Sequence, residues 1–144
     1  MSWDDRTRHV RVGVAILVHR DGKLLFHLRK GPHGPGTWSF PGGNMEYSEE
    51  PIESAQRELL EETGPDARYS ELQVYQPCPY VNTMFPGGKQ YITLYFTCAL
   101  IGGAPRVMEP DKCERWDWFA PSALPKPLFD PLENKRLRLT EWTP

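Results

Sequence analysis

Four glutamates lie close together in the middle of the chain, at Glu53, Glu58, Glu61 and Glu62. In a helix the last three, at i, i+3 and i+4, project from the same side. Like charges at that spacing repel and destabilise an isolated helix. A divalent cation with oxygen ligands would neutralise them, and Mg²⁺ prefers such ligands. The spacing therefore predicts a Mg²⁺ site, with Mn²⁺ as a substitute.

A helix that carries these glutamates is predicted from Glu50 or Pro51 to Thr63. Proline is tolerated in a first turn because its missing N–H would be unsatisfied there. Gly64 is a typical residue for the end of a helix. The predicted apolar stripe leaves the acidic side chains on other faces, and it consists of Ile52, Ala55, Leu59 and Leu60.

Strands are predicted before and after this helix. The residues from His9 to His19 are rich in Val and Ile, and an Asp21-Gly22 turn then leads into a hairpin partner from Lys23 to Arg29. Further strands are predicted at Leu72–Tyr75, Tyr91–Leu100 and Glu114–Phe119, loops at Gly31–Gly36 and Gln76–Lys89, and a short helix at Leu132–Leu139. This order favours a mixed α/β or α+β sandwich, formed as one domain over residues 1–144.

Composition excludes several classes of protein. The formal net charge of −2 lacks the basic surplus of a stable nucleic-acid binder. The longest apolar run, Val12 to Val18, is far shorter than the roughly 20 residues that span a bilayer. Met1 is followed by charged residues, which is not the pattern of a secretory signal. Three cysteines without CxxC spacing indicate free thiols in a reducing compartment, so we expect a cytoplasmic protein.

One motif carries a family resemblance. Gly43, Glu49 and the run Arg57-Glu58-Leu59-Leu60-Glu61-Glu62-Thr63-Gly64 match G-x5-E-x7-R-E-U-x-E-E-x-G, where U is aliphatic. The segment resembles the Nudix box of the MutT-like hydrolases, with Pro65 in place of the closing aliphatic residue. The segments MEPDKCERWDWF and LPKPLFDPLE are similar to those of small nucleotide-hydrolysing Nudix proteins of plants and animals.

The resemblance implies a Nudix-type α/β/α sandwich with a mixed central sheet and a defined set of site residues. It assigns Glu58, Glu61 and Glu62 as metal ligands, together with the carbonyl oxygen of Gly42. Glu49 and Arg57 are expected to support them as an ion pair that clamps the loop to the helix. For the catalytic base the resemblance leaves open Glu61 and Glu62 within the box. Glu109, outside the box, resembles a glutamate that joins the metal in MutT-like enzymes.

Substrate contacts are expected outside the box. Arg29 follows a strand and could grip phosphates, because arginine suits bidentate phosphate contact, although an ordinary exposed base also fits its position. The resemblance implies the contacts to the base. Residues that match a base pocket are Phe40, Thr93, Phe129 and Leu132, with core packing as the alternative for the last two. Relatives carry tryptophan where this chain has Asp130, and a carboxylate there could accept hydrogen bonds from a base amino group.

The implied reaction is Mg²⁺-dependent hydrolysis of a nucleoside triphosphate, canonical or oxidised as in 8-oxo-dGTP, to a monophosphate and pyrophosphate. This activity would cleanse the nucleotide pool. Alternatives are another diphosphate (a nucleotide sugar, a dinucleotide or a prenyl diphosphate) and a nucleotide-binding regulator without catalysis. The retained box glutamates argue against the regulator, and the missing basic patch argues against an RNA-decapping activity. A homodimer is common in the resembling branch, but no feature of the sequence requires it.

Overall fold

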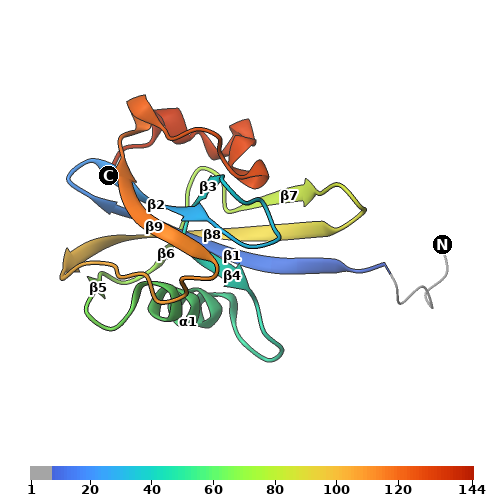
Figure 1. Ribbon diagram of the computed structural model, residues 1–144, viewed down its shortest axis with the longest axis horizontal. Coiled ribbons are helices and arrows are strands. Elements are labelled where there is room, and N and C mark those ends of the chain that lie inside the picture. The colour runs from blue at the N-terminus through green and yellow to red at the C-terminus, as the bar shows by residue number, and fades with distance from the viewer. Residues whose placement is uncertain (1–7) are drawn as a thin grey trace.

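The computed structural model describes residues 8–144. Met1 and the charged residues after it, used above to argue against a secretory signal, lie outside the described residues. A central sheet separates two layers: helix α1 (Pro51–Thr63) on one face and the C-terminal segment on the other (Figure 1). This layering confirms the mixed α/β fold expected from the sequence.

Two long strands run parallel through the sheet. β1 (Val10–Arg20) pairs with β8 (Gln90–Gly102) in a register that extends from Val10 opposite Gln90 to His19 opposite Ala99. The other pairings between strands are antiparallel, which makes the sheet mixed.

The shorter strands extend the sheet on both sides. β2 (Lys23–Arg29) returns beside β1 through a turn with positive φ at Asp21 and Gly22, the geometry that suits a two-residue hairpin. β3 (Trp38–Ser39) and β9 (Cys113–Phe119) pair with β2, and β4 (Gly42–Asn44) pairs with β1. The strands that pair with β8 are β5 (Arg68–Tyr69), β6 (Gln73–Val74) and β7 (Tyr80–Met84).

The core is divided by the sheet because successive side chains of a strand point to opposite faces. Along β1, Val14, Ile16 and Val18 pack with Ala55 and Leu59 of α1. Ala15 and Leu17 face the other way and join the cluster under the C-terminal layer. The helix therefore packs against one face of β1, and the C-terminal layer packs against the opposite face.

Helix α1 has the predicted ends but not the predicted buried face. It begins with a capping box, in which the Glu50 N–H donates to the Glu53 side chain at 2.8 Å. Its buried residues are Ser54, Ala55, Leu59 and Thr63, whereas Ile52 and Leu60 are exposed. The predicted stripe was wrong at these two positions because small and hydroxylated side chains lie against the sheet. The Thr63 hydroxyl is satisfied there by the Leu59 carbonyl at 2.6 Å.

Two further expectations are corrected by the fold. The predicted loop from Gln76 to Lys89 contains β7, which pairs with β8 along its whole length. The helix predicted at Leu132–Leu139 is wrong, because the backbone is extended at Asn134 (φ −68°, ψ 119°) and left-handed at Arg138 (φ 52°). Short 3-10 turns occupy this part of the chain: η1 (Pro121–Ala123), η2 (Asp130–Glu133), η3 (Lys135–Leu137) and η4 (Leu139–Glu141).

Candidate active site

Arg57 is the hub of the glutamate cluster. Its guanidinium donates to both carboxylate oxygens of Glu49, from Nε at 2.7 Å and from Nη2 at 3.0 Å. Nη1 donates to Glu58 at 2.9 Å and to Glu61 at 3.2 Å, and Nη2 also reaches the carbonyl of Asn44 at 3.0 Å. A bidentate arginine–carboxylate pair has a defined geometry. Arg57 therefore ties β4 and the following loop to the helix.

The pair of Arg57 and Glu49 is charged at neutral pH. The hydrogen bond from Arg57 is the main reason that the pKa of Glu49 falls to about 2, assisted by the bond from the Glu46 N–H. The same bond raises the pKa of Arg57. Both groups thus favour the ionised forms that hold the loop in place.

Gly42 turns its peptide groups toward the helix. In the antiparallel ladder with β1, Ile16 donates to the Pro41 carbonyl at 2.9 Å and Met45 donates to the Val12 carbonyl at 3.0 Å. In such a ladder the N–H and C=O groups of alternate residues face the partner strand, so those of Gly42 face away from β1. Its N–H donates to Glu62 at 3.2 Å. Its carbonyl oxygen points to the same side of the strand, where a cation bound by the box glutamates could also contact it.

Gly43 leaves room beside β4 for the carboxylate of Glu58. A Cβ atom at this position would lie within 2.5 Å of the carboxylate oxygens of Glu58, which is closer than real Cβ atoms come to a neighbour. The glycine therefore explains how Glu58 reaches the strand edge. The box pattern requires glycine here for room, not for an unusual backbone angle.

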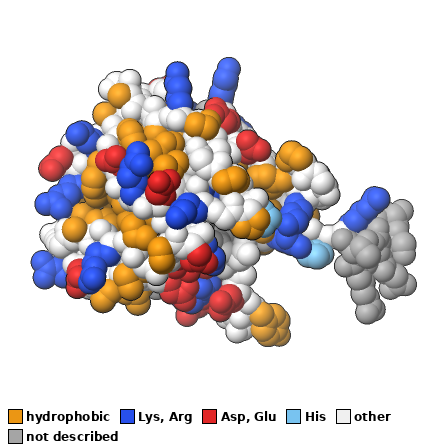
Figure 2. All heavy atoms as spheres, viewed as in Figure 1, with side chains coloured by type: hydrophobic (Ala, Val, Ile, Leu, Met, Phe, Trp, Pro, Cys, Tyr) orange, Lys and Arg blue, Asp and Glu red, His pale blue; other side chains and the backbone are white. Residues whose placement is uncertain are grey.

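The carboxylates of the cluster disfavour one another's charge. Burial raises the pKa of Glu58, and Glu61 and Glu109 raise it further against the opposing effect of Arg57. Burial also raises the pKa of Glu62 well above its usual value, with Glu58 and Glu109 adding to the rise. Figure 2 shows acidic side chains gathered near α1 and the loop after β4. Such a set of repelling oxygen donors fits a hard divalent cation.

The glutamates do not form a closed coordination cage as they stand. Within residues 8–144, no group of three or more His, Cys, Asp or Glu side chains is arranged to hold a metal ion. The hydrogen bonds account for this arrangement, because Arg57 binds Glu58 and Glu61 while Gly42 binds Glu62. The carboxylates would have to turn from these partners to share one cation.

A second wall of the site is aromatic. The Arg29 guanidinium lies 3.8 Å from the centre of the Phe129 ring, and its Nε donates to the His33 carbonyl at 3.0 Å. Burial lowers the pKa of Arg29, and the nearby Glu62 carboxylate opposes that effect. Arg29 thus lies between the glutamate cluster and Phe129.

Phe85 belongs to the same wall and was missed at the level of sequence. It follows β7, and its ring centre lies 5.6 Å from that of Phe129 and 5.8 Å from that of Tyr91. The signal that could have found it is an aromatic residue directly before the Pro86-Gly87 turn of a hairpin.

The remaining predicted base contacts differ in exposure. Thr93 is half-buried on β8 opposite Gly13, and Asp130 is exposed at the start of η2. Phe40 and Leu132 keep only 2% and 4% of their surface exposed and pack in the core. This burial is the core-packing alternative given for Leu132, and it extends to Phe40.

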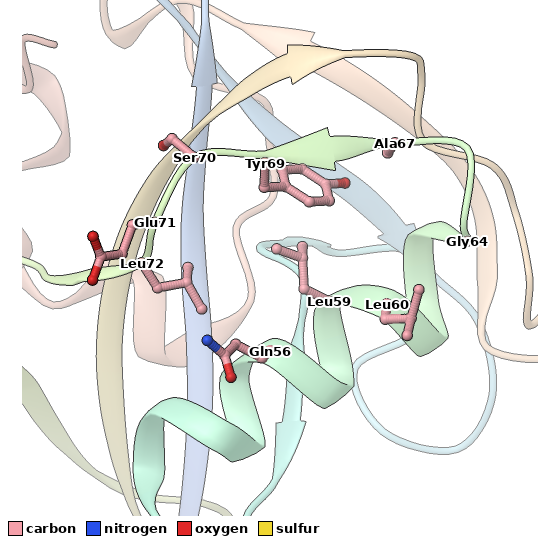
Figure 3. Close-up of a pocket in the computed structure, with 9 residues that line it drawn as sticks. All are labelled: Gln56, Leu59, Leu60, Gly64, Ala67, Tyr69, Ser70, Glu71 and Leu72. Atoms are coloured by element: carbon pink, nitrogen blue, oxygen red, sulfur yellow. The ribbon is translucent and has the colours of Figure 1, made fainter.

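Two hollows of the surface lie away from the box glutamates. One, of about 320 Å³, lies between α1 and the segment that carries β5, with Leu59 and Leu60 facing Tyr69 (Figure 3). The residues on this side of α1 are offset from Glu58 and Glu62 around the helix. The other, of about 550 Å³, includes His19 and Trp142 in its lining. Neither includes a residue of the predicted metal site.

Comparison with known proteins identifies the family. The model of the NUDIX domain matches residues 7–143. The chain belongs to the Nudix family. A MutT-like protein of Streptomyces ambofaciens is 33% identical over 101 residues, which cover 70% of this chain and 58% of the relative. Phosphatase NudJ of Escherichia coli K12 is 42% identical over 57 residues, 40% of this chain and 37% of the relative.

Solved structures agree with the Nudix assignment. A MutT NUDIX hydrolase from Burkholderia pseudomallei superposes with a TM-score of 0.75 at 28% identity, covering 92% of this chain and 98% of that one. A UDP-X diphosphatase shares the fold, with a TM-score of 0.70 at 22% identity over 95% of this chain and 65% of that one. The chain therefore has the Nudix fold, and it spans less than two thirds of the length of the two curated relatives. Among its described residues, no helix is both long and apolar enough to cross a membrane.

Proposed function

We propose that this Nudix hydrolase cleaves nucleoside triphosphates, canonical or oxidised as in 8-oxo-dGTP, to the monophosphate and pyrophosphate with Mg²⁺, or Mn²⁺ as a substitute. The observation that carries this proposal is the position of Arg29. It contacts the aromatic ring of Phe129 and lies near Glu62 of the glutamate cluster. A nucleotide matches these groups, because its aromatic base can contact the Phe129 ring and its phosphate chain can contact Arg29 beside the glutamate cluster.

The residues that would hold Mg²⁺ are Glu58, Glu61, Glu62 and the Gly42 carbonyl, with Glu109 as a further candidate. When bound, the metal would neutralise phosphate oxygens and lower the pKa of water. Arg57 would keep Glu49 and the loop in place while the box carboxylates hold the metal ion. Hydrolysis forms a bond from a water oxygen to phosphorus and breaks the bridging P–O bond, whose electrons leave with pyrophosphate.

The proton of the attacking water needs an acceptor. Glu61 and Glu62 are both candidates within the box, and Glu109 is a candidate outside it. Burial raises the pKa of Glu62 well above its usual value, so this carboxylate holds a proton more readily than a free glutamate does. Glu61 is the more exposed of the two, with 52% of its side chain accessible.

On the substrate side, Phe85, Tyr91 and Phe129 would stack on or enclose the base. Thr93 and Asp130 would supply a hydroxyl and a carboxylate for its polar edge. The aromatic wall favours one second candidate, a prenyl diphosphate, because an apolar chain also fits against phenyl rings. Nucleotide sugars and dinucleotides differ from these two candidates because they carry a second polar group, a sugar or a second nucleoside, beyond the diphosphate.

We further propose a cytoplasmic enzyme that acts on small molecules. The net charge of −2 supports a small-molecule substrate without stable binding of nucleic acid. The three free cysteines support a cytoplasmic location. A role in cleansing the nucleotide pool would follow if oxidised triphosphates are preferred. Light scattering on the purified chain tests whether it forms a homodimer.

The deciding experiment is a panel of canonical and oxidised triphosphates, UDP-sugars, dinucleotides and prenyl diphosphates, each incubated with Mg²⁺ and resolved by chromatography. Monophosphate plus pyrophosphate from a triphosphate is the expected result. Release of orthophosphate alone would contradict the proposal, and preferential cleavage of a prenyl diphosphate would establish the second candidate.

The Glu61→Gln variant tests the role of the box. We expect kcat to fall by more than about a hundredfold, because loss of a metal ligand removes several kcal/mol of transition-state stabilisation. Glu53→Gln is the matched control, since Gln can replace Glu in the capping box of the same helix. Equal activity of Glu61→Gln and wild type would exclude Glu61 from the site.

A further inference from the structure

The ring of Phe129 is held firmly by its neighbours. The Phe129 N–H donates to the carbonyl of Trp38 at 2.9 Å, and the Phe129 carbonyl accepts from the Leu132 N–H at 2.8 Å. The Arg29 guanidinium lies 3.8 Å from the centre of the ring. A Cβ atom added at Gly34 would lie 2.8 Å and 2.9 Å from two atoms of the same ring, so this loop also packs closely against it. Phe129 is therefore a fixed surface of the site.

Phe85 reaches this surface from the tip of the β7–β8 hairpin, which projects from the end of the sheet (Figure 1). The Phe85 N–H donates to the carbonyl of Lys89 at 2.8 Å, and the Phe85 carbonyl accepts from Gly88 at 3.2 Å. A Cβ atom added at Gly87 or Gly88 would have nothing within 4 Å, and residues 86–89 are exposed. Because these hydrogen bonds lie within the turn, Phe85 can shift together with the tip while Phe129 stays in place.

The two rings lie too close together to hold a base between them as they stand. The ring centres of Phe85 and Phe129 are 5.6 Å apart, with a tilt of 32° between the planes. Carbon atoms in contact lie about 3.5 Å apart, so a planar base between two rings needs ring centres about 7 Å apart. A base can therefore enter only if Phe85 moves away from Phe129 by about 1–2 Å.

We propose that Phe85 is a specificity-determining residue, which closes on the base against Phe129 and favours purines over pyrimidines. The inference rests on the proposed function, in which the base contacts Phe129. A purine presents a fused double ring to the two phenyl rings and a pyrimidine presents a single ring, so stacking favours the purine. Loss of an aromatic partner commonly weakens the binding of a base by about fivefold or more.

The Phe85→Leu variant removes the ring but keeps an apolar side chain, and Phe85→Met replaces it if that variant does not fold. Phe85→Tyr keeps the ring and serves as the conservative variant. The matched control is Met84→Ala, since Met84 is the neighbouring residue at the end of β7 and is 61% exposed. Successive side chains of a strand point to opposite faces, so Met84 does not share the contact with Phe129.

The measurement is calorimetric titration of the full chain with Mg²⁺ and the non-hydrolysable α,β-imido analogues of dGTP and dCTP. We expect wild type to bind the dGTP analogue more tightly. Phe85→Leu should raise the Kd of the dGTP analogue by about tenfold and that of the dCTP analogue by less than about threefold. Phe85→Tyr should recover most of this loss, and Met84→Ala should stay within about twofold of wild type.

Turnover of dGTP and dCTP provides a second readout. The loss in Phe85→Leu should appear in KM rather than in kcat, because Phe85 would contact the base and not the bond that is broken. A general disturbance of the fold would instead lower kcat for both triphosphates.

The outcomes separate this inference from the proposed function. Wild type that binds neither analogue and cleaves neither triphosphate contradicts both. If wild type binds the analogues but cleaves no triphosphate, the proposed function fails, and the ratio of the two Kd values still decides the role of Phe85. An equal change for both analogues in Phe85→Leu, or no change, overturns the role of Phe85 alone, as does a wild type that prefers the pyrimidine.

Discussion

At the scale of single residues, the ion pair of Glu49 and Arg57 predicts a defined response to acid. The folded-state pKa of Glu49 is about 2, below the usual value of 4.5. Its stabilising effect is therefore fully present above pH 4.5 and is lost as pH falls toward 2. Glu49→Gln should lower the melting temperature at pH 7, and the difference from wild type should shrink between pH 4.5 and pH 2. A difference that stays constant across thermal melts in this range would show that Glu49 is not held by Arg57.

His27 predicts a response to acid of a different origin. Burial, assisted by the charge of Arg29, lowers its pKa from 6.5 to about 3, and its Nδ1 has no hydrogen-bond partner among the described atoms. The unfolded chain binds a proton between these values and the folded chain does not, so stability falls as pH drops from 6.5 to 3. His27→Phe should remove this loss. The free energy of unfolding of the variant minus that of wild type should therefore be about 2 kcal/mol larger at pH 5 than at pH 8. Urea unfolding at the two pH values measures the gain, and an equal difference at both would contradict it.

At the scale of elements, the contact of β4 with α1 predicts the effect of a single methyl group. In Gly43→Ala the new Cβ would meet the Glu58 carboxylate, so strand and helix must separate or Glu58 must turn away. We expect kcat to fall by about tenfold or more, with weaker Mn²⁺ binding. Gly22→Ala is a contrasting variant, because nothing lies within 4 Å of its Cβ position and its strain stays in a distant turn. Full activity in Gly43→Ala would show that the contact is not needed.

Elements were predictable from sequence where local signals decided them. Pro51 and Gly64 mark the helix at both ends, and the Asp21-Gly22 turn marks the first hairpin. β7 was not predictable because its sequence, YVNTM, is mostly exposed and only Val81 is buried, so the pairing with β8 and not a hydrophobic pattern makes it a strand. Phe85 had a local signal in the Pro86-Gly87 turn that follows it, but its contact with Phe129 joins residues far apart in the chain and could not be read from that turn.

At the scale of the whole molecule, the site depends on two layers that the sheet keeps apart. The box glutamates come from the α1 side, whereas Phe129 comes from the C-terminal layer and Arg29 from β2 between them. Sequence spacing could group the glutamates, because they share one helix. It offered core packing for Leu132 only as an alternative and did not predict it for Phe40, since burial of these side chains depends on how the C-terminal turns fold over the sheet.

Among the bonds that tie the C-terminal layer to the sheet side, one buried side-chain hydrogen bond can be tested alone. The hydroxyl of Tyr75 donates to the carbonyl of Leu137 at 2.6 Å, and both residues are buried. Tyr75→Phe leaves that carbonyl without its donor and should lower the free energy of unfolding by about 1–2 kcal/mol. Because the loss lies in the C-terminal layer, amide exchange should accelerate first around Leu137 and Leu139, with kcat almost unchanged. Uniform acceleration across α1 and β1 would instead show that both layers unfold as a single unit.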